Sequence, residues 1–185
     1  KGISHACNQN NYTLAFFLAS DKDDENNIYT CVPTNGLLDG VLIQSGLHGD
    51  QQIIGHLIGA GIPLVVIGRP FPLNKVSFVN IDNVEASKNA VSYLADLGYQ
   101  RIATVTGPLE STVGIDRRDG YLKALRERGM STEKQLMAEG DFSDRSGYEA
   151  MQRLLLEHPD AVFAASDMMA IGAIRAIREK GLSVP

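Results

Sequence analysis

Short apolar runs alternate with segments of helical periodicity along most of the chain. The apolar runs predict strands at 12–20, 39–44, 63–68, 76–81, 101–107, 135–140 and 161–166. Most of these runs are apolar at consecutive positions. That pattern is typical of strands covered by helices on both faces, whereas a sheet with one face in water alternates apolar and polar residues. The order therefore predicts an α/β fold built from βαβ units with a parallel sheet.

Helical periodicity fills the gaps between the predicted strands. The ranges are 50–61, 83–98, 144–159 and 167–181, and another helix follows the turn after the strand at 101–107. Gly98 suits a left-handed helix end, while Ser143 and Asp167 are suitable N-caps for the last two ranges. The stretch 21–36 predicts a short helix followed by a loop, because Pro33 would break the last turn of any helix there.

Composition describes a soluble globular chain. Its 185 residues are 44% hydrophobic and 21% charged. No segment approaches the roughly 18 uninterrupted apolar residues of a membrane span, and the first residues lack the order of a signal peptide. We therefore expect a cytoplasmic protein.

Charge and ligand chemistry narrow the possible functions. The chain carries 17 Lys and Arg against 22 Asp and Glu, and neither half has an excess of basic residues. A nucleic-acid surface needs a concentrated positive field, so this polypeptide is not expected to bind DNA or RNA by itself. Cys7 and Cys31 are isolated, and the four histidines form no ligand pattern, so we expect neither a metal nor a cofactor.

The segment VTGPLESTVGIDRR at 105–118 predicts a strand, a Gly-Pro turn, a polar loop and a helix. Such a turn can hold a phosphate at the helix N-terminus. A phosphate-binding loop requires GxxxxGK[ST], and a dinucleotide fold requires GxGxxG directly after its strand. Gly107 and Gly114 fit neither spacing, which disfavours nucleotide binding.

Arg117 and Arg118 follow that loop, and we expect both in the first turn of the helix. Cations there are disfavoured by the helix dipole. Asp116 and Asp119 could balance them as ordinary surface ion pairs. Alternatively, one arginine points to the carboxyl ends of the strands, where open α/β sheets bind ligands and a guanidinium suits carboxylates, phosphates or vicinal hydroxyls.

Other candidate site residues also follow predicted strands. Phe142 could stack on a ligand ring or staple its helix to the core. Ser166 and Asp167 open a helix, and capping accounts for only one of them. Arg69 and Asp82 have turn and capping roles as alternatives. Together these positions predict a small-molecule cleft between two α/β lobes.

The sequence shows no catalytic constellation. It contains no Ser–His–Asp order, no nucleophile elbow and no pair of carboxylates at a convincing spacing. We therefore expect a binding protein rather than an enzyme.

Several segments, taken in order, resemble the effector-binding domain of the LacI/GalR transcriptional regulators. They are GRP, VNIDNVEAS, VTGPLESTVGIDRR, GDFSDRSGY and AASDMMA, and the resemblance covers about 11–185, most specifically 79–185. It implies a two-lobed periplasmic-binding-protein-like (type I) fold, with parallel sheets flanked by helices and a small effector in the interlobe cleft. The first lobe would be 1–82 and the second 83–185, both incomplete relative to the family pattern.

Members of that family are usually homodimers that bind operator DNA through an N-terminal helix-turn-helix headpiece. We expect this chain to lack the headpiece, the opening strand, most of the first helix and the final strands, which normally supply another acidic ligand residue. The implied function is to sense a sugar or related metabolite and thereby alter operator binding. A periplasmic sugar receptor of a transport system is the alternative, and an enzyme on a similar sheet is a third possibility.

The resemblance also implies roles for individual residues. Arg117 matches the arginine that commonly holds the effector, and Phe142 matches an aromatic wall of the pocket. The resemblance also places Ser166 and Asp167 at the rim of the cleft and Arg69 on its first-lobe side. Ser111 and Val113 occupy a loop that varies with the ligand, and Asp82 and Asn83 fall at a crossover. Pro33 departs from the family pattern.

Overall fold

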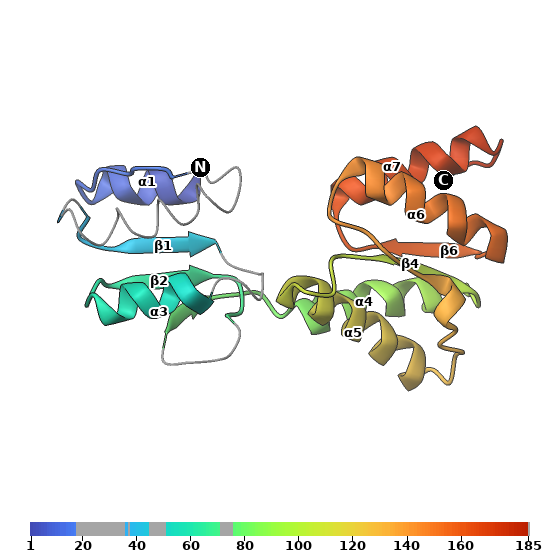
Figure 1. Ribbon diagram of the computed structural model, residues 1–185. Coiled ribbons are helices and arrows are strands. Elements are labelled where there is room, and N and C mark those ends of the chain that lie inside the picture. The colour runs from blue at the N-terminus through green and yellow to red at the C-terminus, as the bar shows by residue number, and fades with distance from the viewer. Residues whose placement is uncertain (18–35, 37, 45–50, 71–75, 185) are drawn as a thin grey trace. The chain divides into compact units, whose positions relative to one another are not determined.

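The computed structural model describes residues 1–17, 36, 38–44, 51–70 and 76–184 (Figure 1). Almost all of the stretch 21–36, with its predicted helix and loop, lies outside the described residues. The helices of the described part are α1 (Gly2–Gln9), α3 (Gln51–Gly59), α4 (Asn83–Asp96), α5 (Thr112–Glu127), α6 (Asp144–Leu154) and α7 (Asp167–Glu179). The strands are β1 (Val41–Gln44), β2 (Leu64–Ile67), β3 (Ser77–Val79), β4 (Ile102–Thr106), β5 (Met137–Glu139) and β6 (Ala161–Ala164).

Two sheets organise these strands. One has the order β1-β2-β3 and the other has the order β5-β4-β6. β2 runs parallel to β3, and β4 runs parallel to both of its neighbours, with Thr104 opposite Met137 on one side and Phe163 on the other. The predicted α/β fold with parallel sheets is therefore confirmed.

The chain forms two compact units. The first consists of Lys1–Val41 with Gln52–Pro63, and the second consists of Leu42–Gln51 with Leu64–Pro185. The second unit holds the β5-β4-β6 sheet, helices α4 to α7 and all of the predicted ligand-binding residues.

The central strand β4 is covered by helices on both faces, which agrees with its mostly apolar sequence. All five of its residues are buried. Ala103 and Val105 belong to a core formed with α6 and α7, whereas Ile102 belongs to a core formed with α4 and α5. Figure 1 shows these two helix pairs on opposite faces of the sheet. Successive side chains of a strand point to opposite faces, so a strand covered on both sides buries nearly all of its positions, and Thr104 and Thr106 are the polar residues that β4 buries.

Helices α6 and α7 pack so closely that glycine is required at their contact. A Cβ added to Gly172 would collide with the carbonyl oxygen of Asp144, and one added to Gly147 would collide with the backbone of Met169. Gly120 brings α5 equally close to the backbone of α4 at Val84. These contacts fix the helix positions that carry the site.

Some predicted elements differ from the structure. Residues 12–17 of the predicted strand 12–20 form no strand, and Tyr12, Phe16 and Phe17 are exposed there; residues 18–20 lie outside the described part. An apolar run alone specifies a strand poorly, because a ladder also needs a partner. Helix α1 was not predicted from the sequence. The strand predicted at 135–140 begins later, because Lys134–Leu136 form a short 3-10 helix. Nowhere in the described ranges does a helix combine the length and apolarity needed to cross a membrane.

Candidate ligand-binding site

The start of α5 places the arginines of the predicted site. Ser111 is the N-cap: its Oγ accepts a hydrogen bond from Gly114 N at 2.9 Å and donates one to Pro108 O at 2.9 Å. A side chain at Gly114 would collide with Pro108 O, so the turn lies directly on the helix. The helix therefore begins before Val113, which was predicted in a loop. Arg117 accordingly lies in the second turn, and its prediction in the first turn was wrong because the serine caps the helix earlier.

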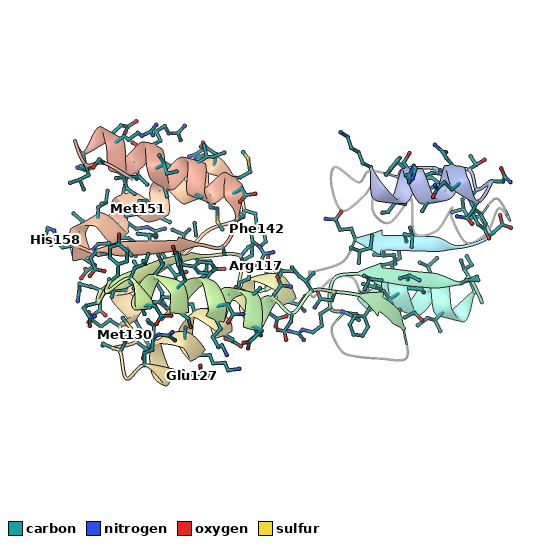
Figure 2. The ribbon with its side chains drawn as sticks, turned by 180° about the vertical axis from the view of Figure 1, so that it is seen from behind. Arg117, Glu127, Met130, Phe142, Met151 and His158 are labelled. Atoms are coloured by element: carbon teal, nitrogen blue, oxygen red, sulfur yellow. The ribbon has the colours of Figure 1, made fainter. Side chains whose placement is uncertain are left out.

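Arg117 is held by two neutral oxygens. Its Nε donates to Asn83 Oδ1 at 2.9 Å, and its Nη1 donates to the carbonyl oxygen of Ala165 at 2.5 Å. Burial lowers the pKa of this half-buried guanidinium, while the negative charge of Asp167 acts in the opposite direction. Figure 2 shows Arg117 and Phe142 at the same end of the β5-β4-β6 sheet.

A cavity of about 350 Å³ lies beside Arg117. This volume is within the range of small-molecule sites. Its polar lining comes from Asn83, Ser87, Arg117, Ser166 and Asp167, and its apolar lining from Ile81, Ala86, Phe163, Ala164 and Ala165. The lining thus combines one cation, one carboxylate and three neutral polar side chains.

Ser166 and Asp167 have different roles at the start of α7. The Oγ of Ser166 accepts a hydrogen bond from Met169 N at 3.3 Å, so Ser166 is the N-cap. Capping thus accounts for one of the two residues, as expected, and Asp167 is not the cap because the serine precedes it in extended backbone. Asp167 is instead the first helical residue, and its exposed side chain lies at the cavity.

Arg118 and Arg69 differ from Arg117 because carboxylates neutralise both. Arg118 pairs with Asp119, with 2.7 Å between Nη2 and Oδ1. Arg69 follows β2 and binds the buried Asp116, whose hydrogen bond raises the pKa of Arg69. Each arginine of the pair therefore fits one of the two alternatives. Arg118 makes an ordinary ion pair, and Arg117 lines the cavity.

Phe142 packs on protein atoms. Its backbone has a φ of 69°, an uncommon conformation for a bulky residue. The half-buried ring lies against the core between β4, α6 and α7, and directly over Gly107, where any Cβ would collide with it. These contacts are those of a side chain that anchors the start of α6.

Asp82 caps α4, with its Oδ1 accepting from Glu85 N at 2.9 Å. Of the eight predicted ligand-binding residues, Arg117, Ser166 and Asp167 line the cavity; within the described part of the chain the other five do not contribute to its lining. Asn83, which was expected only at a crossover, and Ser87 line it without having been predicted as ligand-binding residues. They are four positions apart and therefore lie on the same face of α4. This spacing of two polar residues was the available signal, but only the apolar stripe of the helix was used to predict it.

Comparisons with known proteins decide the family. Residues 1–185 match the family described as "Periplasmic binding proteins and sugar binding domain of LacI family". The chain belongs to this family. It is 43% identical over 152 residues to the HTH-type transcriptional regulator CelR of Thermobifida fusca, covering 80% of this chain and 44% of CelR. It is 33% identical over 188 residues to the HTH-type transcriptional repressor PurR of Erwinia tasmaniensis, covering 100% of this chain and 55% of PurR.

Solved LacI-family structures share the fold. A transcriptional regulator CelR–cellobiose complex superposes with a TM-score of 0.91 at 33% identity, covering 100% of this chain and 57% of that one. The transcription regulator CcpA of Lactococcus lactis gives a TM-score of 0.87 at 26% identity, with 100% and 68% coverage. The resemblance to LacI-family regulators and the periplasmic-binding-protein-like fold are confirmed. The chain spans about half the length of the curated relatives it matches.

Proposed function

We propose that this chain is the ligand-sensing part of a LacI-family transcriptional regulator and binds a sugar in the cavity beside Arg117. The observation that carries the proposal is the half-buried arginine, held by neutral oxygens at a cavity that also contains Asp167. A guanidinium and a carboxylate together can donate to and accept from vicinal hydroxyls. One cation balanced by one acid suits a neutral ligand better than a phosphate.

The relatives support a specific first candidate. A similar regulator, CelR, has been solved as a complex with cellobiose. We therefore take cellobiose as the first ligand to test on this chain. The named relatives are HTH-type regulators, which favours a sensor of gene regulation over a periplasmic receptor of a transport system or an enzyme.

Regulation requires the sugar to prefer one conformation of the protein. A ligand changes operator affinity only as far as it binds one conformation more tightly, and operator DNA then changes ligand affinity by the same factor. In this proposal 1–82 and 83–185 are the two lobes, the full-length protein is a cytoplasmic homodimer, and a headpiece outside this chain contacts the DNA.

Calorimetry on the full-length regulator tests the proposal, with cellobiose, glucose 6-phosphate and hypoxanthine as ligands. We expect saturable binding of cellobiose. Replacing Arg117 by alanine should weaken it by about 10- to 100-fold, the effect of losing a hydrogen bond to a charged group. Arg118→Ala is the matched control, because that neighbouring arginine pairs with Asp119. Preference for the phosphate, or equal effects of the two substitutions, would contradict the proposed site.

A further inference from the structure

We propose that Asn83 is a positioning residue, which orients the guanidinium of Arg117 for ligand binding. This inference rests on the proposed function only for the role of Arg117 toward the sugar. The orientation itself is a property of the ligand-free protein. Asn83 opens helix α4, is 4% exposed and lines the same cavity as Arg117.

The amide of Asn83 is itself oriented by the chain before α4. Its Nδ2 donates to the carbonyl oxygen of Ile81 at 3.2 Å and to Asn80 Oδ1 at 3.4 Å. These contacts turn the opposite atom, Oδ1, toward Arg117, where it accepts from Nε at 2.9 Å. A flipped amide would direct its NH₂ group at the guanidinium, and two donors would face each other. The network therefore permits one amide orientation.

Two fixed points determine the plane of the Arg117 guanidinium. Asn83 holds Nε, and the carbonyl oxygen of Ala165 holds Nη1. These bonds use two of the five N–H donors that a guanidinium carries. Among the described residues Arg117 makes no further hydrogen bond, so the other donors are available to a ligand in the cavity. A donor group fixed before binding loses less conformational freedom when the ligand arrives.

The neutrality of both anchors distinguishes this arginine from its neighbours. Arg69 and Arg118 are held by carboxylates, which cancel their charge. Asn83 supplies geometry without a negative charge, so Arg117 stays a net cation. Asp167 on α7 is the charged group that acts on Arg117, and its effect is Coulombic rather than a hydrogen bond. An amide at position 83 thus fixes the orientation, and the guanidinium keeps its charge for charge-assisted hydrogen bonds to ligand hydroxyls.

The first test needs no ligand. The Nε–Hε signal of Arg117 in the NMR spectrum of the full-length regulator, assigned by its loss in Arg117→Lys, reports how fast Hε exchanges with water. We expect Asn83→Ala to accelerate this exchange about tenfold, the effect of losing one hydrogen bond to a charged group. Asn83→Asp keeps the accepting oxygen and should keep the exchange slow. Asn89→Ala, an exposed asparagine of the same helix, is the matched control and should change nothing.

The second test uses cellobiose as the probe. Asn83→Ala should weaken binding about tenfold in the wild-type background but cause no further loss in an Arg117→Ala background, because coupled residues are not additive. Unchanged Hε exchange in Asn83→Ala, or additive losses of affinity, would overturn the positioning role. If exchange responds as expected but cellobiose does not bind the wild type, the positioning role stands and the proposed ligand is wrong. Urea unfolding of each variant shows whether Asn83→Ala folds; if it does not, Asn83→Ser supplies the shortened side chain instead.

Discussion

Arg69 binds Asp116 through two hydrogen bonds, with Nε 3.0 Å from Oδ2 and Nη2 2.5 Å from Oδ1. The backbone of the same arginine accepts a bond from Thr112 Oγ1 at 2.9 Å, so the turn after β2 is attached to the first two turns of α5. Asp116 is 8% exposed. The buried carboxylate makes this contact far more sensitive to substitution than a surface ion pair.

Removing Arg69 should therefore destabilise the protein. In Arg69→Met a buried carboxylate loses its partner, and we expect the free energy of unfolding to fall by about 2 to 3 kcal/mol, somewhat less than for a fully buried pair. Arg118→Met removes the pair with Asp119, whose side chain is 46% exposed, and should cost less than about 1 kcal/mol. Urea unfolding measures both variants, and equal losses would contradict a special role for Asp116.

The sequence predicted the fold well because β4 and the surrounding helices carry consistent local signals. The mostly apolar run at 102–106 predicted a strand covered on both faces, and Gly98, with a φ of 96°, ends its helix as expected. By contrast, residues 12–17 carried the apolar signal without forming a strand. Local patterns specify elements, whereas strand pairing depends on residues elsewhere in the chain.

The site was predicted less completely for a related reason. Arg117 meets Asn83 and Ala165, which are 34 and 48 positions away, so no local pattern specifies these contacts. The neighbouring arginines look equivalent in the sequence, and only the helix phase set by the Ser111 cap separates them. The role of Asn83 in the cavity was not predicted because the helix was identified from its apolar positions alone.

Two threonines of β4 offer a direct test of buried hydroxyl groups. Thr104 Oγ1 donates to Phe163 O at 2.9 Å, whereas Thr106 Oγ1 is buried and has no partner among the described residues. Thr104→Val should lower the free energy of unfolding by about 1 kcal/mol, because a bond is lost. Thr106→Val should be neutral or stabilising, since it removes an unsatisfied group of similar shape. Chemical denaturation of the two variants distinguishes them, and an equal loss in both would show that Thr106 has a partner.

The close contact of α6 and α7 predicts opposite effects of the same substitution at two helical glycines. Gly172→Ala places a methyl group against the carbonyl oxygen of Asp144, so the helices must separate, at a cost of about 1 to 3 kcal/mol. At Gly55 of α3 a methyl group meets no atom of the described residues within 4 Å, and Ala should stabilise the helix by about 0.5 to 1 kcal/mol. Thermal unfolding should therefore shift in opposite directions. A neutral Gly172→Ala would mean that the helix pair adjusts freely.

Tyr121 gives the fold a dependence on alkaline pH. Its buried hydroxyl donates to Ile102 O at 2.8 Å. Burial, with a smaller contribution from the charge of Glu133, raises the pKa of Tyr121 from 10.0 to about 12. The folded state therefore holds the phenol proton more tightly than the unfolded state. The contribution of protonated Tyr121 to the free energy of unfolding is complete below pH 10 and is lost as the pH rises from 10 to 12.

Replacing Tyr121 by phenylalanine should remove that dependence. The variant should be less stable than the wild type by about 1 kcal/mol at neutral pH, because the hydrogen bond is lost. The difference should shrink above pH 10, since ionisation destabilises only the wild type. Tyr93→Phe, at an exposed position of α4, should keep the full alkaline loss. Urea midpoints measured from pH 8 to 11.5 test this, and parallel curves for wild type and Tyr121→Phe would show that another group ionises on unfolding.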